Sequence, residues 1–165
     1  MLNSKAAILM LIVVSASATA QPSSAKSQIQ SLYDKAGSLL IRQDVKGFVK
    51  FLQETRTPGY IYISKQGRHP LNELLKSMAM VLSTYRVSKS SVQINKITNS
   101  KDGVIVAVTT ILGLETKPTK AHTKHTVEQE VHGEDSWVRL GTKWKLKLSR
   151  IVTENVIEDG RTGKQ

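Results

Sequence analysis

The chain has 165 residues and no cysteine, and 24 Lys and Arg against 13 Asp and Glu give a net charge of +11. This length suits one domain with a continuous core. The lack of cysteine excludes disulfides, thiolate nucleophiles, zinc fingers and iron–sulfur ligation. The positive charge favours anionic neighbours but does not indicate a fold.

The first 20 residues have the pattern of a secretory signal peptide. Lys5 precedes an apolar run from Ala6 to Val14, and small residues follow as far as Ala18-Thr19-Ala20. The run is shorter than the roughly 20 residues that a membrane-spanning helix needs, and the small-residue site is typical of cleavage. An uncleaved anchor is the alternative. We expect cleavage after Ala20 and export to the periplasm or the medium, with no membrane span and weak attraction to anionic envelope polymers.

Helical patterns come next in the chain. Residues 21–26 are expected to be a flexible start, and apolar residues at helical spacing predict a first helix from Ser27 to about Arg42. Asp44 suits the N-cap of a short second helix. Pro70 suits the first turn of a third helix, whose apolar stripe runs to Tyr85. One domain is therefore predicted over residues 27–157.

The remaining sequence predicts strands. They are expected at Tyr60–Ile63, Ser91–Ile97, Val104–Leu112, His122–Leu140 and Trp144–Val156, with a frayed tail at 158–165. The third of these is apolar on both faces, which is typical of the middle of a sheet. A bulge near Gly133 would bend the long strand. Gly141-Thr142 matches a two-residue type II′ hairpin turn.

The last hairpin also carries a motif. Asp135 to Leu146 reads D-x-W-V-x-x-x-x-x-W-K-L, with Asp159-Gly160 further on, and the element order extends over about Ser27 to Gly160. Together they resemble the nuclear transport factor two-like superfamily, particularly its SnoaL-like branch. The resemblance implies an α+β cystatin-like cone fold, in which a curved mixed or antiparallel sheet wraps around a pocket and packs on three N-terminal helices.

What the resemblance implies about function is open. The superfamily includes ketosteroid isomerase, scytalone dehydratase, polyketide cyclases and noncatalytic binding or assembly domains, so the fold does not select an activity. Many of its members dimerise through the sheet, and we therefore expect a homodimer.

The expected turn fixes a register for the hairpin. Trp137 would then oppose Leu146, and Asp135 would oppose Leu148. One face would carry Asp135, Trp137, Arg139, Trp144, Leu146, Leu148 and Arg150, which we assign to the concave side; the other would carry Ser136, Val138, Lys145, Lys147 and Ser149. Asp135 and Arg150 become diagonal neighbours and are predicted to form a structural salt bridge. The alternative is a free Asp135 that acts as an acid/base.

Aromatic and charged residues of the pocket are the candidate ligand-binding set. They are Tyr33, Tyr60, Tyr62, Tyr85, Asp135, Trp137, Trp144 and Arg150, although for both tryptophans a place in the core is favoured over stacking on a ligand. No catalytic residue is identified beyond the candidate Asp135, because Arg56 to Ser64 contains none of the Asp, Glu or His residues that an isomerase base requires. We expect no cofactor, since no nucleotide, serine-hydrolase or zinc-protease motif is present.

Two other kinds of site are considered and not favoured. His122, His125 and His132 lie near Glu128 and Glu130, but on an extended strand His125 points away from the others, so no metal site is expected. No nucleic-acid-binding motif is found, and specific nucleic-acid binding is not expected. The sequence thus predicts an exported domain that binds a small apolar molecule or serves as an assembly module. The alternative is a small-molecule isomerase, dehydratase or cyclase that uses Asp135.

Overall fold

Three helices precede the long strands, and local sequence sets their ends. In the computed structural model, which describes residues 22–117, 125–159 and 161–163, the helices are α1 (Pro22–Ile41), α2 (Val45–Thr55) and α3 (Leu71–Thr84). Asp44 caps α2 as predicted, because its carboxylate accepts a hydrogen bond from the Gly47 amide at 2.9 Å. Helix α3 begins directly after Pro70, as expected. Helix α1 begins at Pro22 and so includes described residues that we expected to be a flexible start.

The strands form one mixed sheet. They are β1 (Arg56–Ser64), β2 (Gly67–Pro70), β3 (Tyr85–Ser100), β4 (Gly103–Thr116), β5 (Thr126–Leu140), β6 (Lys143–Glu158) and β7 (Arg161–Gly163). Their order is β2-β1-β6-β5-β4-β3, with β7 paired to β6. Strands β1 and β6 are parallel and the other pairs are antiparallel. The apolar strand β4 lies inside the sheet, as its sequence predicts, and Val106 is fully buried. The predicted α+β fold class is confirmed.

The last hairpin has the predicted turn, but its register changes part of the way along. Gly141 has a positive φ of 61°, and Trp137 opposes Leu146 as expected. Beyond that pair Lys147 is an extra residue on β6, so Asp135 opposes Ser149 rather than Leu148. Side chains of a strand normally alternate between the two faces of the sheet, and the extra residue breaks this alternation. The β6 residues that follow Lys147 therefore lie on the opposite faces from those predicted.

A second irregularity lies where a bulge was expected. The register between β5 and β6 shifts between His132 and Gly133, but the extra residue is Val152 on β6 rather than a residue of β5. A Cβ atom at Gly133 would lie 2.9 Å from the Arg150 carbonyl oxygen, so the two backbones approach closely there. The sheet bends as predicted, with the inserted residue on the partner strand.

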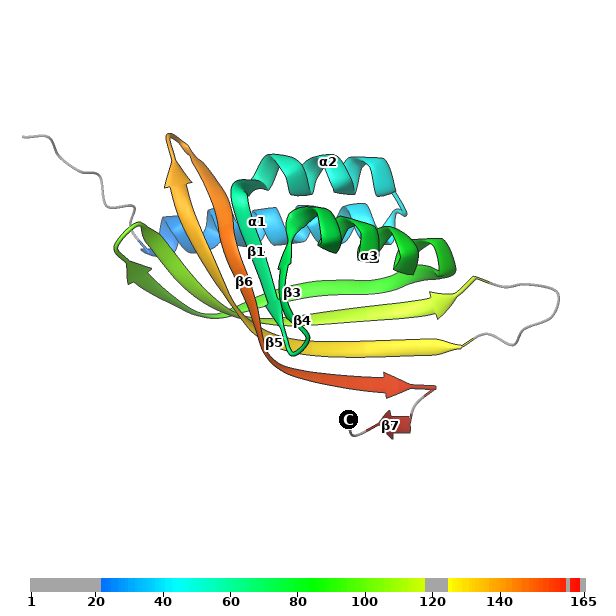
Figure 1. Ribbon diagram of the computed structural model, residues 1–165. Helices are drawn as coiled ribbons and strands as arrows, with labels where there is room; N and C mark the ends of the chain where they lie inside the picture. Colours follow the sequence, from blue (N-terminus) through cyan, green and yellow to red (C-terminus); the bar gives the residue numbers. More distant parts are fainter. Residues whose placement is uncertain (1–21, 118–124, 160, 164–165) are drawn as a thin grey trace, which may run out of the picture.

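The bent sheet and the helices enclose the core (Figure 1). All three helices lie on the same side of the sheet, and the long strands curve beneath them. One buried cluster joins the first half of α1 to the sheet, with Ile29, Trp137 and Leu146 almost fully buried. A second cluster lies among α1, α2, α3 and the ends of β3 and β4.

The described residues nearest the C-terminus form the short strand β7. Residues Arg161–Gly163 pair with Val156–Glu158, inside the segment that we expected to be frayed. The predicted signal peptide lies outside the described residues. Among the described helices, none combines the length and the hydropathy that a membrane span requires.

Candidate functional site

A cavity of about 290 Å³ lies between the helices and the concave side of the sheet. Its walls are largely apolar, with residues from both core clusters. The apolar lining includes Ala36, Leu40, Phe48, Leu52, Leu74, Met78, Val92, Val108, Leu112, Val131, Leu146 and Ile151. Polar side chains gather at one part of this wall, namely Tyr33, Arg56, Tyr60, Tyr62, Asp135 and Ser149. A mostly apolar cavity with a few convergent polar groups is typical of a small-molecule site.

Asp135 is the buried carboxylate of this wall, with only 8% of its surface exposed. The Tyr33 hydroxyl donates a hydrogen bond to Asp135 Oδ2 at 2.5 Å, and the Ser149 side chain is also hydrogen-bonded to this carboxyl group. The Trp137 indole nitrogen donates to the Tyr33 oxygen at 2.9 Å. Because the Tyr33 oxygen already accepts from Trp137, its own proton is directed to Asp135. Residues more than 100 positions apart therefore form one chain of hydrogen bonds.

Burial changes the proton affinities of this group. It raises the pKa of Asp135 above its ordinary value of 3.8, against the opposing effects of the hydrogen bonds from Ser149 and Tyr33 and of the positive charge of Arg56. Burial likewise raises the pKa of Tyr33 well above 10.0. Nearby, burial and the charge of Glu154 raise the pKa of Tyr62 to about 12. A carboxyl group with a raised pKa that faces a cavity is a candidate proton donor or acceptor.

Arg56 supplies a positive charge to the same wall. It follows directly after α2, and its Nη1 donates to Thr55 Oγ1 at 2.9 Å. Its guanidinium carbon lies 5.6 Å from the centre of the Tyr60 ring, and burial lowers the pKa of the arginine. The sequence reasoning missed Arg56 because it searched this segment only for Asp, Glu and His. The available signal was a charged residue between an amphipathic helix and the turn-forming pair Pro58-Gly59.

The predicted pair of Asp135 with Arg150 is wrong. The extra residue Lys147 places Ser149 opposite Asp135 and Glu134 opposite Arg150. The Arg150 side chain is exposed, and among the described residues no ion pair joins it to Asp135. Arg150 still borders the cavity. The partners of the carboxylate are instead Tyr33 and Ser149, with Arg56 as the cation that acts on it.

The structure divides the other predicted ligand-binding residues into two groups. Tyr33, Tyr60 and Tyr62 line the cavity, as do Asp135 and Arg150. The remaining three lie in the packed interior. Trp137 and Trp144 are buried in the first core cluster, where the Trp144 indole donates to Gln28 Oε1 at 2.9 Å, and Tyr85 packs against the second cluster. A direct contact of any of the eight with a ligand stays a prediction.

His132 of β5 and His125, which directly precedes this strand, contact neighbouring polar side chains. His132 Nε2 lies 3.1 Å from Glu130 Oε1, and its Nδ1 lies 3.0 Å from Thr109 Oγ1. His125 Nδ1 lies 2.8 Å from Asp159 Oδ2, which lowers the pKa of that carboxyl group. His122 lies outside the described residues. Within the described ranges, no three His, Asp or Glu side chains are grouped closely enough to hold a metal ion.

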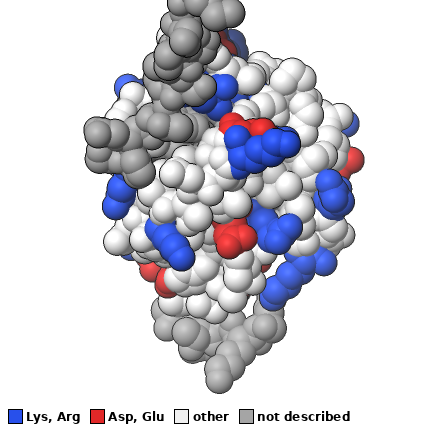
Figure 2. All heavy atoms as spheres, turned by 90° about the vertical axis from the view of Figure 1, so that its left-hand side faces the viewer, with Lys and Arg blue, Asp and Glu red and all other residues white. Residues whose placement is uncertain are grey.

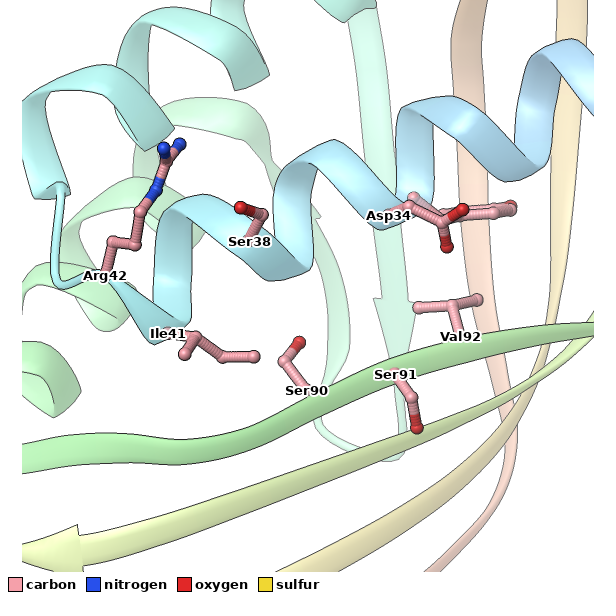
Figure 3. Close-up of a pocket in the computed structure, with 8 residues that line it drawn as sticks. Asp34, Ser38, Ile41, Arg42, Ser90, Ser91 and Val92 are labelled. Carbon is pink, nitrogen blue, oxygen red and sulfur yellow. The ribbon is translucent and has the colours of Figure 1, made fainter.

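A groove of about 350 Å³ lies on the other side of Tyr33, between α1 and β3 (Figure 3). Ile41 and Val92 point into the space between the helix and the strand, whereas Arg42 points away from β3. Tyr33, Ser90 and Val92 line both this groove and the cavity. The groove and the cavity are therefore separated by a thin wall of side chains.

Comparisons with solved structures find the same architecture. This chain is similar to a conserved protein from Planctomyces limnophilus, with a TM-score of 0.58 and 13% identity over 76% of this chain and 94% of the other. It is similar to a proposed dehydratase of the NTF2-like family from Streptomyces avermitilis, with a TM-score of 0.57 and 15% identity over 79% and 97% of the two chains. It is also similar to a proposed Ca/calmodulin-dependent kinase II association domain from Exiguobacterium sibiricum, with a TM-score of 0.56 and 9% identity over 88% and 98%.

These likenesses bear on the fold alone, because the identities are low. No protein-family model and no curated protein matches the sequence. The SnoaL-like branch thus stays a prediction. The element order, the curved mixed sheet and the solved structures agree that this chain has the cone-shaped α+β fold of the nuclear transport factor two-like (NTF2-like) superfamily.

Proposed function

We propose that the cavity binds a small, mostly apolar molecule that carries one polar group. The observation that carries this proposal is the buried carboxyl group of Asp135 in an otherwise apolar wall. A buried carboxyl group is costly unless it is well partnered, and a purely structural role would be filled more cheaply by an apolar side chain. At about 290 Å³ the cavity lies at the lower end of the range for small-molecule pockets, so the ligand is small.

Two neighbouring threonines of β4 give a matched test. Thr110 lines the cavity, whereas Thr109 points to the opposite face, where it accepts a hydrogen bond from Asn95 Nδ2 at 2.8 Å. We expect the neutral fluorescent probe N-phenyl-1-naphthylamine to bind the wild-type protein at one saturable site. Thr110→Phe should fill the cavity and abolish this binding, and Thr109→Phe should preserve it. Circular dichroism would establish that both variants are folded. Equal binding by the two variants, or no binding by the wild type, would overturn the proposal.

An acid/base enzyme is the second candidate. It is favoured by one observation, the burial of Asp135 beside Tyr33, which raises the pKa of the carboxyl group. The similar protein from Streptomyces avermitilis is itself a proposed dehydratase. The reaction would be an isomerisation, dehydration or cyclisation in which Asp135 moves a proton. On this reading Asp135→Asn should abolish turnover while the probe still binds, because the amide keeps the shape of the site but cannot exchange a proton at neutral pH.

We also propose that the protein is exported and dimeric. The signal-peptide pattern supports export, and N-terminal sequencing of protein from the producing cell should begin at Gln21; a start at Met1 would contradict it. The outer face of the sheet, where Ile105 is 40% exposed, is the expected dimer surface, and sedimentation should show twice the chain mass. In Figure 2 basic side chains are scattered over one end of the molecule among uncharged ones, which suits weak, nonspecific attraction to anionic envelope polymers.

A further inference from the structure

Within the described residues, the buried side-chain polar atoms that lack a hydrogen-bond partner lie side by side in the sequence. They are Arg56 Nε and Thr57 Oγ1, at the start of β1. Arg56 also lines the cavity. A buried donor without an acceptor costs free energy, and the cost is larger when the donor is charged. The cavity wall thus contains a buried, positively charged residue whose hydrogen-bonding capacity is not fully used.

Asp135 lies on the same wall but does not neutralise Arg56 by direct contact. Each charge acts on the other. Although both residues are described, no ion pair within 4.0 Å joins them. The guanidinium group instead contacts Thr55 and Tyr60, whose side chain it meets both at the ring and through a hydrogen bond. Arg56 and Asp135 therefore line one cavity without forming an ion pair with each other.

The charges around Asp135 determine which chemical group of a ligand the cavity can hold beside it. The titratable and charged groups near it are Tyr33 from α1 and Arg56, Tyr60 and Tyr62 from β1, with Arg150 of β6 at the border of the cavity. The tyrosines stay neutral, because burial raises the pKa of each of them. Two buried carboxylates cannot both ionise at close range, so a second carboxyl group next to Asp135 would share one proton with it. The shared pair would carry one negative charge, which Arg56 balances.

We propose that the ligand is a monocarboxylic acid with an apolar body, whose carboxyl group is bound by Arg56 and shares one proton with Asp135. This inference rests on the proposed function and specifies its ligand class. The planar guanidinium fork matches the two oxygens of a carboxyl group, and such charge-assisted bonds are the stronger ones in proteins. A neutral alcohol would leave Arg56 without its anionic partner. A sulfonate would supply the charge, but its oxygens are far weaker bases than a carboxylate and do not share the proton of Asp135 as an equal partner.

The shared proton makes binding depend on pH in a defined direction. When Asp135 is ionised in the free protein, binding of a carboxylate takes up one proton, so Kd rises about tenfold for each pH unit. When Asp135 is already protonated, binding takes up no proton and Kd is constant. Isothermal titration calorimetry of the full wild-type protein, in two buffers with different ionisation enthalpies, measures this uptake directly.

The probes are octanoate, 1-octanol and 1-octanesulfonate, which share one apolar chain and differ in the head group. Each would compete with N-phenyl-1-naphthylamine for the cavity. We expect octanoate to bind more tightly than the other two. Arg56→Gln should weaken octanoate binding by roughly tenfold to a hundredfold, with little effect on 1-octanol. Arg68→Gln removes the same charge from an exposed position on β2, and it should change the affinity for neither octanoate nor 1-octanol.

Asp135→Asn separates the role of the proton from that of the charge. The amide donates an N–H group to a carboxylate at any pH, so octanoate should still bind but with constant Kd and no proton uptake. Equal affinity of the wild-type protein for octanoate and 1-octanol would overturn the inference and leave the proposed function standing. Constant octanoate affinity from neutral to alkaline pH without proton uptake would overturn the shared proton. Failure of the wild type to bind any probe, N-phenyl-1-naphthylamine included, would overturn the proposed function itself. The wild-type measurements decide these outcomes even if the Arg56 variant does not fold.

Discussion

Tyr33→Phe should destabilise the protein more strongly at neutral pH than in acid. The Tyr33 hydroxyl donates to Asp135 at 2.5 Å and accepts from Trp137 at 2.9 Å, so its removal affects two buried partners. Loss of a hydrogen bond to a charged group costs about 1.5–3 kcal/mol, and a stranded buried donor costs about 1–3 kcal/mol. The free energy of unfolding at neutral pH should therefore fall by about 3–5 kcal/mol.

The pH dependence follows from the carboxyl group. In the folded wild type the pKa of Asp135 is raised by burial, and the Tyr33 hydrogen bond offsets part of that rise. Removing the hydroxyl raises the folded-state pKa further. Below the unfolded-state value near 3.8, Asp135 is protonated in every state, so the variant lacks only neutral hydrogen bonds. As pH rises through the wild-type pKa toward that of the variant, the difference in stability grows, by about 1 kcal/mol or more.

Urea denaturation of both proteins at neutral pH and near pH 3 measures these differences. Tyr85→Phe is the matched control, because Tyr85 is also partly buried but its hydroxyl has no hydrogen-bond partner among the described residues. The free energy of unfolding of the Tyr85→Phe control should fall by well under 1 kcal/mol. Equal losses for Tyr33→Phe at the two pH values would show that the hydroxyl does not act on an ionised Asp135 in this range, and a loss no larger than that of the control would refute the whole network.

Two further predictions test the local geometry. Asp44→Ala removes the cap of α2 and should lower the free energy of unfolding by about 1 kcal/mol, as measured by thermal or urea denaturation; an unchanged midpoint would show that the cap does not act. Gly133→Ala places a Cβ atom 2.9 Å from the Arg150 carbonyl oxygen and should destabilise by about 1–3 kcal/mol, whereas Gly59→Ala, with no atom within 4 Å of the added carbon, should not. Similar free energies of unfolding for these two variants would show that the sheet does not bend at Gly133.

Local patterns in the sequence determined the elements of the fold. Apolar spacing predicted the helices, Asp44 and Pro70 predicted where two of them begin, and the Gly141-Thr142 turn predicted the hairpin with Trp137 opposite Leu146. These features depend on neighbours within a few residues, so the sequence carries them directly. The hairpin motif and the element order also indicated the superfamily fold that the solved structures share.

Only the tertiary structure decided the partners of Asp135. The alternation of Lys, Trp and Leu continues without interruption through Lys147, so nothing in the sequence marks it as the extra residue that exchanges Leu148 for Ser149 opposite Asp135. Tyr33 reaches the same carboxylate from a position 102 residues away, and Arg56 reaches the wall from the end of α2. The alternation of side chains along a strand determines the face of the sheet on which each residue lies. A single inserted residue reverses the faces of the residues that follow it. The site was therefore settled by long-range packing, and the arginine that we propose as its anion-binding residue became visible only once the helices were placed on the sheet.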